Sequence, residues 1–191
     1  VLTLDQKRIE KELSQKKINQ VEPSISSNDI KNVTKYLASG GWVTEHEVSR
    51  EFEKRVSSYV DRKFGIVVPN GTIALYLALL GLGVGPGKKV AVPNITMIAT
   101  INAILWTGAK PVIVDVDDNL CLSLEKLKTI KNLHTVIFVP LNGREGNGKK
   151  IESWCRSEKI YLVEDSAHAL GSSYSHKTVS YTHLRAHETD R

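Results

Sequence analysis

The sequence predicts an α/β fold in which a mostly parallel sheet is covered by helices. Short apolar runs recur along the chain between turn residues, as the strands of a buried sheet would. Segments with helical spacing of apolar residues alternate with these runs, and helical crossovers between strands produce a parallel sheet. The 191 residues, 41% hydrophobic and 25% charged, suit one globular domain with a sizeable core.

The N-terminal part is expected to be helical. The composition of residues 1–20 indicates a polar, charged helix or arm. A helix should begin near Ser27 and end at Gly40–Gly41, because its apolar residues recur at helical spacing. A short extended piece over 42–44 and a second helix from about Glu47 should follow.

Five strand–helix units are expected after this region. The predicted strands are 64–68, 90–93, 111–115, 135–139 and 160–164. The predicted helices are 73–82, 96–106, 124–130 and 149–157. The first strand rests on the continuous apolar run Phe64–Val68, which is typical of a buried strand. The stretch 180–191 has no apolar period and does not continue this alternation, so we expect it to be non-native and leave it outside the fold.

Charge and composition exclude several classes of function. The net charge is +5, but the basic residues are scattered, whereas a nucleic-acid face would concentrate them. Cys121 and Cys155 lie far apart and the six histidines are dispersed, which predicts reduced thiols and no metal site. No apolar run approaches the ~20 residues that span a bilayer. The N-terminus does not resemble a secretory signal, so a cytoplasmic enzyme or binding protein is expected.

The segment Asn70-Gly71-Thr72 is a candidate anion site, because it lies between a predicted strand and a helix. Gly71 would let a ligand approach the backbone, and free N–H groups of Thr72 and Ile73 would face it. A phosphate suits this segment better than ATP or NAD, since it has neither P-loop nor Rossmann glycine spacing. The alternative is a plain Asn-Gly turn with Thr72 as a helix cap.

Asp165 and His168 follow the last predicted strand. A buried aspartate is costly unless it meets a cation or several donors, and a protonated ring nitrogen would satisfy it. The alternative is a capping aspartate beside a solvent-facing histidine. A phosphate site on one strand end and a buried acid on another suggest pyridoxal phosphate (PLP), which offers both a phosphate and a pyridine nitrogen.

Several motifs in order resemble the DegT/DnrJ/EryC1/StrS family of PLP-dependent sugar aminotransferases, in particular its perosamine-synthetase-like members. The resemblance covers about residues 21–179. The matching blocks are Gly41-Trp42-Val43-Thr44, Glu51-Phe52-Glu53, Asn70-Gly71-Thr72-Ile73-Ala74-Leu75, Gly83-Val84-Gly85-Pro86-Gly87, Val92-Pro93-Asn94 with Thr96 and Ala99-Thr100, Gly108–Val112 with Val114–Asp117, and Val163–His168 with Gly171-Ser172.

The resemblance implies a fold-type I PLP-dependent transferase large domain, incomplete over 21–179 and truncated before the small C-terminal domain. By resemblance, Thr72 and Ile73, with Gly71 beside them, would hold the cofactor phosphate. Asp165 would pair with the pyridine nitrogen, and His168 would sit beside the phenolic oxygen.

Two positions depart from the family pattern. Met97 stands where the family usually places an aromatic residue on the pyridine ring; its polarizable sulfur could cover the ring face, or it could be plain core. Pro140–Gly143 keeps the glycine of a family motif but lacks its histidine, which affects substrate contacts there.

The resemblance also implies the reaction. The full-length protein would be a cytoplasmic homodimer that transfers an amino group from an amino acid, commonly glutamate, to a nucleotide-linked keto sugar. The family's Schiff-base lysine has no counterpart here, since Lys177 is too near Asp165 in sequence, and this chain alone is expected to be inactive. A lysine-lacking PLP-dependent sugar dehydratase and a non-catalytic α/β regulatory or binding module are the alternatives.

Overall fold

The structure is a computed structural model that describes residues 23–42, 47–169, 171–174, 177–178 and 183–185. The chain divides into two units, Val1–His46 and Glu47–Arg191. In the first unit, helix α2 (Ser27–Ala38) begins as predicted. Ser26 caps it, because its side chain accepts from the Asp29 amide while the Asp29 carboxylate accepts from the Ser26 amide. The predicted arm over 1–20 lies outside the described residues.

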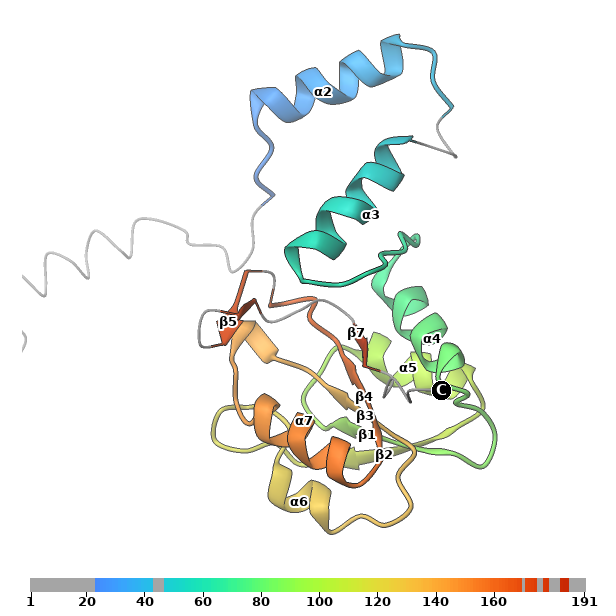
Figure 1. Ribbon diagram of the computed structural model, residues 1–191, viewed down its shortest axis with the longest axis vertical. Helices are drawn as coiled ribbons and strands as arrows, with labels where there is room; N and C mark the ends of the chain where they lie inside the picture. The colour runs from blue at the N-terminus through green and yellow to red at the C-terminus, as the bar shows by residue number, and fades with distance from the viewer. Residues whose placement is uncertain (1–22, 43–46, 170, 175–176, 179–182, 186–191) are drawn as a thin grey trace, which may run out of the picture. The chain divides into compact units, whose positions relative to one another are not determined.

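The second unit contains the α/β part of the chain (Figure 1). Its helices are α3 (Glu47–Tyr59), α4 (Gly71–Gly81), α5 (Ile98–Trp106), α6 (Leu124–Lys128), the short 3₁₀ turn η1 (Leu141–Gly143) and α7 (Gly148–Ser157). Its main-sheet strands are β1 (Lys89–Pro93), β2 (Lys110–Val114), β3 (Thr135–Phe138), β4 (Tyr161–Glu164) and β7 (His183–Arg185). A separate antiparallel pair is formed by β5 (Ser173–Tyr174) and β6 (Lys177–Thr178).

The main sheet has the strand order β2-β1-β3-β4-β7. Strands β1 to β4 pair in parallel, which confirms the predicted α/β class and four of its five predicted strands. Because parallel strands run in the same direction, the carboxyl ends of β1 to β4 meet at one edge of the sheet. That edge is where ligands bind in open α/β folds.

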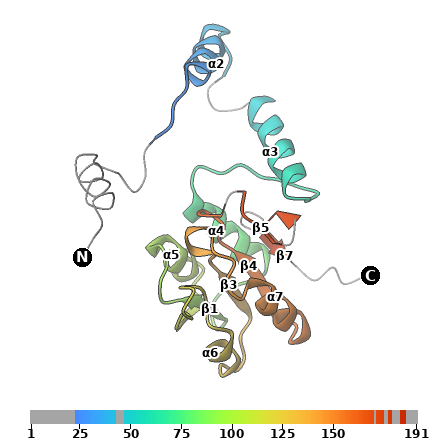
Figure 2. The ribbon, with the colours of Figure 1, turned by 90° about the vertical axis from the view of Figure 1, so that its left-hand side faces the viewer.

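Helices cover both faces of the sheet, with α4 and α5 on one and α6 and α7 on the other (Figure 2). Side chains alternate between the faces along each strand, as the pleat requires. Val90 and Val92 pack with α4 and α5, whereas Ala91 between them packs with α6 and α7. The two apolar layers hold the strand ends in fixed positions.

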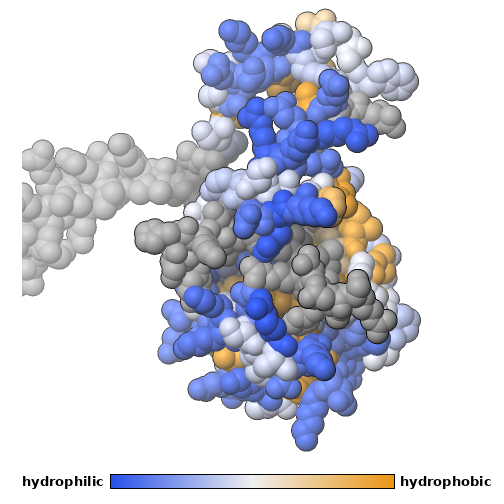
Figure 3. Space-filling model, viewed as in Figure 1, coloured by the Kyte–Doolittle hydropathy of each residue, from blue (hydrophilic) through white to orange (hydrophobic). Residues whose placement is uncertain are grey.

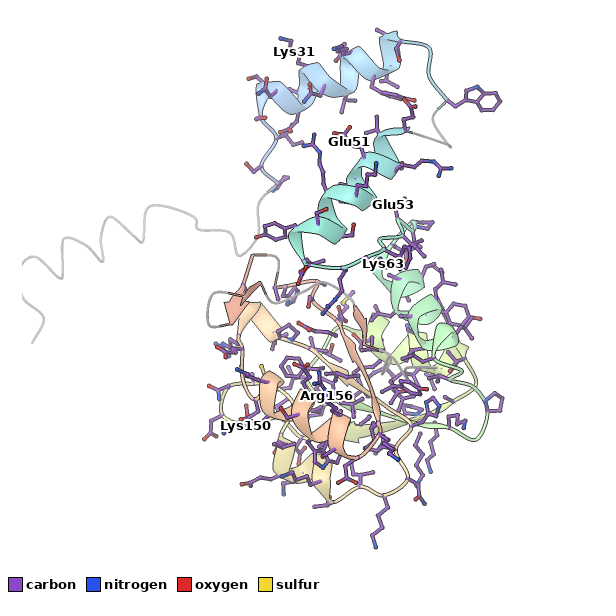
Figure 4. The ribbon with its side chains drawn as sticks, in the orientation of Figure 1. Lys31, Glu51, Glu53, Lys63, Lys150 and Arg156 are labelled. Atoms are coloured by element: carbon purple, nitrogen blue, oxygen red, sulfur yellow. The ribbon has the colours of Figure 1, made fainter. Side chains whose placement is uncertain are left out.

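The predicted strand over 64–68 is wrong. This segment has no strand assignment, and its Phe64 and Ile66 side chains are 76% and 82% exposed. The Val67 amide donates instead to a carboxylate oxygen of Glu53, at 2.9 Å. Glu53 belongs to α3 (Figure 4). An apolar run becomes a strand only where a neighbouring strand accepts its backbone hydrogen bonds, and the described residues supply none here.

Part of the C-terminal stretch lies in the sheet. Residues 183–185 form β7, which pairs antiparallel with β4 and places Leu184 opposite Val163. The remainder of 180–191 lies outside the described residues. The non-native origin of this stretch and the domain limits at 20 and 179 stay predictions.

The described residues include no helix long and apolar enough to cross a membrane. Cys121 and Cys155 are buried and free, in agreement with the expected reduced thiols. Burial raises the pKa of the Cys155 thiol to about 12, so this side chain remains neutral at physiological pH.

Candidate functional site

The carboxyl edge of the sheet is tied together by polar side chains that follow the strands. After β1, the Asn94 side-chain amide donates to Asp115 at 3.0 Å, and the Asn94 backbone amide donates to the Val114 carbonyl at 2.9 Å. These bonds join the ends of β1 and β2. The segments that follow β1 and β2 therefore meet at one edge of the sheet.

Asp165 lies immediately after β4 and is 9% exposed. Its backbone amide donates to the Phe138 carbonyl at the end of β3, at 2.8 Å. Its Oδ2 accepts a hydrogen bond from the Thr100 hydroxyl at 2.8 Å, and its Oδ1 accepts a longer one, 3.4 Å, from the Ala167 amide. The Asp165 carboxylate is thus buried, and the protein supplies only part of its hydrogen bonds. This position therefore has features of both interpretations made from the sequence, the buried acid that needs a cation and the capping aspartate.

Thr100 is a site residue to which the sequence analysis assigns no role. It lies in the first turn of α5 with no exposed surface, and its hydroxyl also contacts that of Thr96 at 3.0 Å. A signal was present in the sequence, because Thr100 shares a helical face with Ala103 and Ile104, at i+3 and i+4. A hydroxyl on an apolar face must find a partner when it is buried.

Glu164, the residue before Asp165, is half-buried. The Ser166 hydroxyl donates to its Oε1 at 2.8 Å. Burial raises the pKa of the Glu164 carboxyl to about 7, although the Ser166 hydrogen bond and the positive charge of Arg62 act in the opposite direction. Two adjacent carboxyl groups therefore lie at the carboxyl end of β4, and that of Glu164 titrates near neutral pH.

The start of α4 differs from the expectation in two respects. The helix begins at Gly71, two residues earlier than predicted, and Asn70 rather than Thr72 is its cap. The Asn70 side chain accepts from the Ile73 amide at 3.0 Å, so the Ile73 amide is not free as the sequence analysis expects. Within the described residues, the amides of Gly71 and Thr72 have no acceptor, as is usual in the first turn of a helix.

The helix end and the buried acid belong to one packed layer. Leu75, one turn after Thr72, and Val163, two residues before Asp165, are members of the same apolar cluster. Both side chains have almost no exposed surface. The packing of α4 on the sheet therefore fixes the position of Thr72 relative to the strand ends.

Met97 and His168 are both exposed at this edge. Met97 precedes the first residue of α5 and is 67% exposed, so the interpretation of Met97 as plain core is wrong. His168 lies in the turn after Asp165, where the Ala169 amide donates to the Ser166 carbonyl at 2.9 Å. The turn also approaches Gly143, whose carbonyl accepts from the Ser172 hydroxyl at 3.3 Å.

The residues present fit a ligand that has an anionic end and a cationic ring nitrogen. The first turn of α4 presents two amides and the hydroxyl of Thr72, and a helix N-terminus favours negative charge. Asp165 presents a buried carboxylate whose Oδ1 has only one long hydrogen bond to the protein in the described residues. The site can therefore bind a phosphate at one place and a protonated nitrogen at another.

Comparisons with known proteins show the family to which the chain is similar. Residues 23–184 match the model of the DegT/DnrJ/EryC1/StrS aminotransferase family. The chain is 34% identical to the UDP-4-amino-4-deoxy-L-arabinose–oxoglutarate aminotransferase of Shewanella sediminis (strain HAW-EB3), over 84% of this chain and 42% of that protein. It is 32% identical to the GDP-perosamine synthase of Escherichia coli O157:H7, over 83% of this chain and 44% of that protein.

A solved structure shows the same fold. The PLP form of Spr1654 from Streptococcus pneumoniae superposes with a TM-score of 0.77 at 30% identity, covering 85% of this chain and 46% of that one. The chain thus spans less than half the length of the proteins it matches. The family match extends over most of the chain and includes both ends of the site, and the chain therefore belongs to the DegT/DnrJ/EryC1/StrS aminotransferase family.

Proposed function

We propose that this chain is the cofactor-binding part of a PLP-dependent aminotransferase. The proposed substrate is a nucleotide-linked keto sugar, and the proposed amino donor is an amino acid, with glutamate as the donor to assay first. Two similar proteins support the proposal, since one is named for a UDP-linked amino sugar and the other for GDP-perosamine.

The observation that carries the proposal is the buried carboxylate of Asp165 at the end of a parallel strand. In the proposal, Asp165 holds the ring nitrogen of PLP in its protonated form, and bound PLP then acts as an electron sink for the amino-group transfer. Thr72 binds the phosphate with its amide and hydroxyl, and Gly71 adds a second amide. The Ile73 amide lies next to them in the same turn, where the Asn70 side chain accepts from it. Met97 covers one face of the ring, and His168 lies beside the phenolic oxygen.

The proposal includes a homodimer and a cytoplasmic location. Support for a second copy comes from α4, which is apolar on all sides although a surface helix normally has a polar face. Exposed apolar side chains gather over this helix (Figure 3). They include Leu77 and Leu80 on α4, and Leu105 and Trp106 lie exposed on α5. An apolar surface of this kind is a site for protein association.

The test is a transfer assay on the gene product that contains this chain. The protein is incubated with PLP, nitrogen-15-labelled glutamate and a panel of UDP- and GDP-linked keto sugars, and the sugar products are analysed by mass spectrometry. Labelled nitrogen in a sugar product is the expected result. Loss of water from the sugar without uptake of nitrogen would identify the dehydratase, and failure to bind PLP would identify a non-catalytic module.

A further inference from the structure

Thr100 and Asp165 are joined across 65 positions of sequence. The Thr100 hydroxyl donates to Oδ2 of Asp165 at 2.8 Å, and Thr100 has no exposed surface. Thr100 is the third residue of α5, whereas Asp165 follows β4. The bond therefore links a helix that begins beyond β1 to the carboxyl end of β4, on the other side of β3.

The direction of the hydrogen bonds can be deduced from the number of protons. A threonine hydroxyl has one proton, and that of Thr100 is donated to the Asp165 carboxylate. In the 3.0 Å contact between Thr96 and Thr100, Thr96 must therefore be the donor. The two hydroxyls form a chain that ends on Oδ2, and each bond in such a chain polarises the next.

This chain fixes the rotation of the carboxylate. The terminal torsion of an aspartate has a broad energy minimum, so its carboxylate plane needs a hydrogen bond to be held in one orientation. Thr100 supplies that bond at Oδ2. Oδ1 has only the long 3.4 Å bond from Ala167 among the described residues, and it remains available to a ligand.

We propose that Thr100, supported by Thr96, is a positioning residue that orients the Asp165 carboxylate toward the ring nitrogen of the cofactor. This inference rests on the proposed function, because it assigns Asp165 to that nitrogen. Thr100 itself does not touch the cofactor. Its contribution is to hold one carboxylate oxygen so that the other meets the nitrogen in a single orientation.

The test measures PLP binding to the gene product that contains this chain, by fluorescence titration and by the circular dichroism that the protein induces in the bound cofactor. Thr100→Val keeps the shape of the side chain but removes the donor, and we expect PLP to bind about tenfold more weakly. The induced dichroism should decrease because the ring is no longer held in one orientation. Thr100→Ser restores the hydroxyl and should restore both signals.

Thr107→Val is the matched control. Thr107 is another buried threonine next to α5, and its hydroxyl donates to the Ile104 carbonyl at 2.7 Å, away from Asp165. We expect this variant to lose stability while PLP affinity and induced dichroism stay at the wild-type level. The control separates a general packing defect from a loss of positioning.

The outcomes distinguish the inference from the proposed function. If the wild-type gene product that contains this chain binds no PLP, the proposed function fails and the inference fails with it. If the wild-type protein binds PLP and its Thr100→Val variant binds it equally well with the same dichroism, only the inference is overturned. If Thr100→Val does not fold, the Thr96→Val variant is measured instead. Weaker PLP binding by Thr96→Val supports the inference, and PLP binding at the wild-type level contradicts it.

Discussion

Asp165 and Asn70 mark the two ends of the candidate site, and the protein holds them in different ways. Asp165 is buried, and its carboxylate is bound by Thr100 from a distant part of the sequence. Asn70 is exposed and binds the amide of Ile73, three residues further along. The acid end therefore depends on the assembled sheet, whereas the helix end is built from consecutive residues. Substitutions at the acid end should have the larger effects.

Asp165→Asn is expected to have the largest effect. The amide keeps the size of the side chain and can still accept from Thr100, but it has no charge to pair with a protonated ring nitrogen. Loss of one partner of a buried charge pair costs about 2–5 kcal/mol, so PLP affinity should fall about hundredfold or more. Fluorescence titration of the gene product that contains this chain with PLP measures this change.

Asp115→Asn is the control for this comparison. Asp115 also follows a parallel strand, but it is exposed and pairs with the side chain of Asn94. PLP affinity should remain at the wild-type value in this variant. An equal loss of PLP affinity in Asp115→Asn and Asp165→Asn would mean that burial does not determine which of the two acids binds the cofactor.

The fold was predictable where apolar periodicity and sheet pairing agree. Strands β1 to β4 and the helices between them lie within a few residues of their predicted positions, because turn residues bound each segment. Phe64–Val68 has the composition of a strand, but its Phe64 and Ile66 side chains are exposed and its Val67 amide donates to Glu53. The composition of a segment shows whether its side chains can be buried. A strand also requires a neighbouring strand that pairs with its backbone N–H and C=O groups, and the local sequence does not show whether such a strand is present.

The same distinction applies to the site. The position of Asp165 after a buried strand was predictable from the sequence alone. Its partner Thr100 was not assigned, because the bond crosses the sheet and depends on the strand order. At the helix end, the helix does begin within the indicated segment, but the alternative interpretation of Thr72 as its cap is wrong. Asn70 and Thr72 are both competent caps, and only the backbone geometry decides between them.

Glu164 offers a second test of the acid end through the dependence of stability on pH. Burial raises the pKa of its carboxyl from 4.5 to about 7, so between these values the folded chain holds a proton that the unfolded chain has lost. Stability should therefore fall as the pH rises through this window, by about 2–3 kcal/mol in total. Glu164→Gln should remove this loss, as measured by urea denaturation at pH values below and above the window.

Glu158→Gln is the matched control, because Glu158 is an exposed glutamate just after α7. Its pH dependence of unfolding should follow that of the wild-type chain. A Glu164→Gln variant whose stability still falls as steeply would show that another group causes the pH dependence.

Thr72→Val tests the helix end directly. The hydroxyl is a donor next to two backbone amides that remain in place, so its loss should weaken PLP binding only about tenfold. Thr129→Val removes an exposed threonine hydroxyl at the end of α6, where it donates to the Lys126 carbonyl, and should leave PLP affinity unchanged. A loss at Thr72 as large as that at Asp165 would contradict the proposed division between the two ends.

Asn70→Ala should have the smallest effect, and it separates capping from ligand binding. Loss of the cap should lower the free energy of unfolding by about 1 kcal/mol, because the Ile73 amide loses its acceptor. Asn70→Ser retains a capping oxygen and should stay close to wild type. The open amide in Asn70→Ala should then bind an anion more readily, so inorganic phosphate should stabilise this variant more than the wild-type chain against urea. Equal stabilisation of the two by phosphate would place the anion elsewhere than at the Ile73 amide.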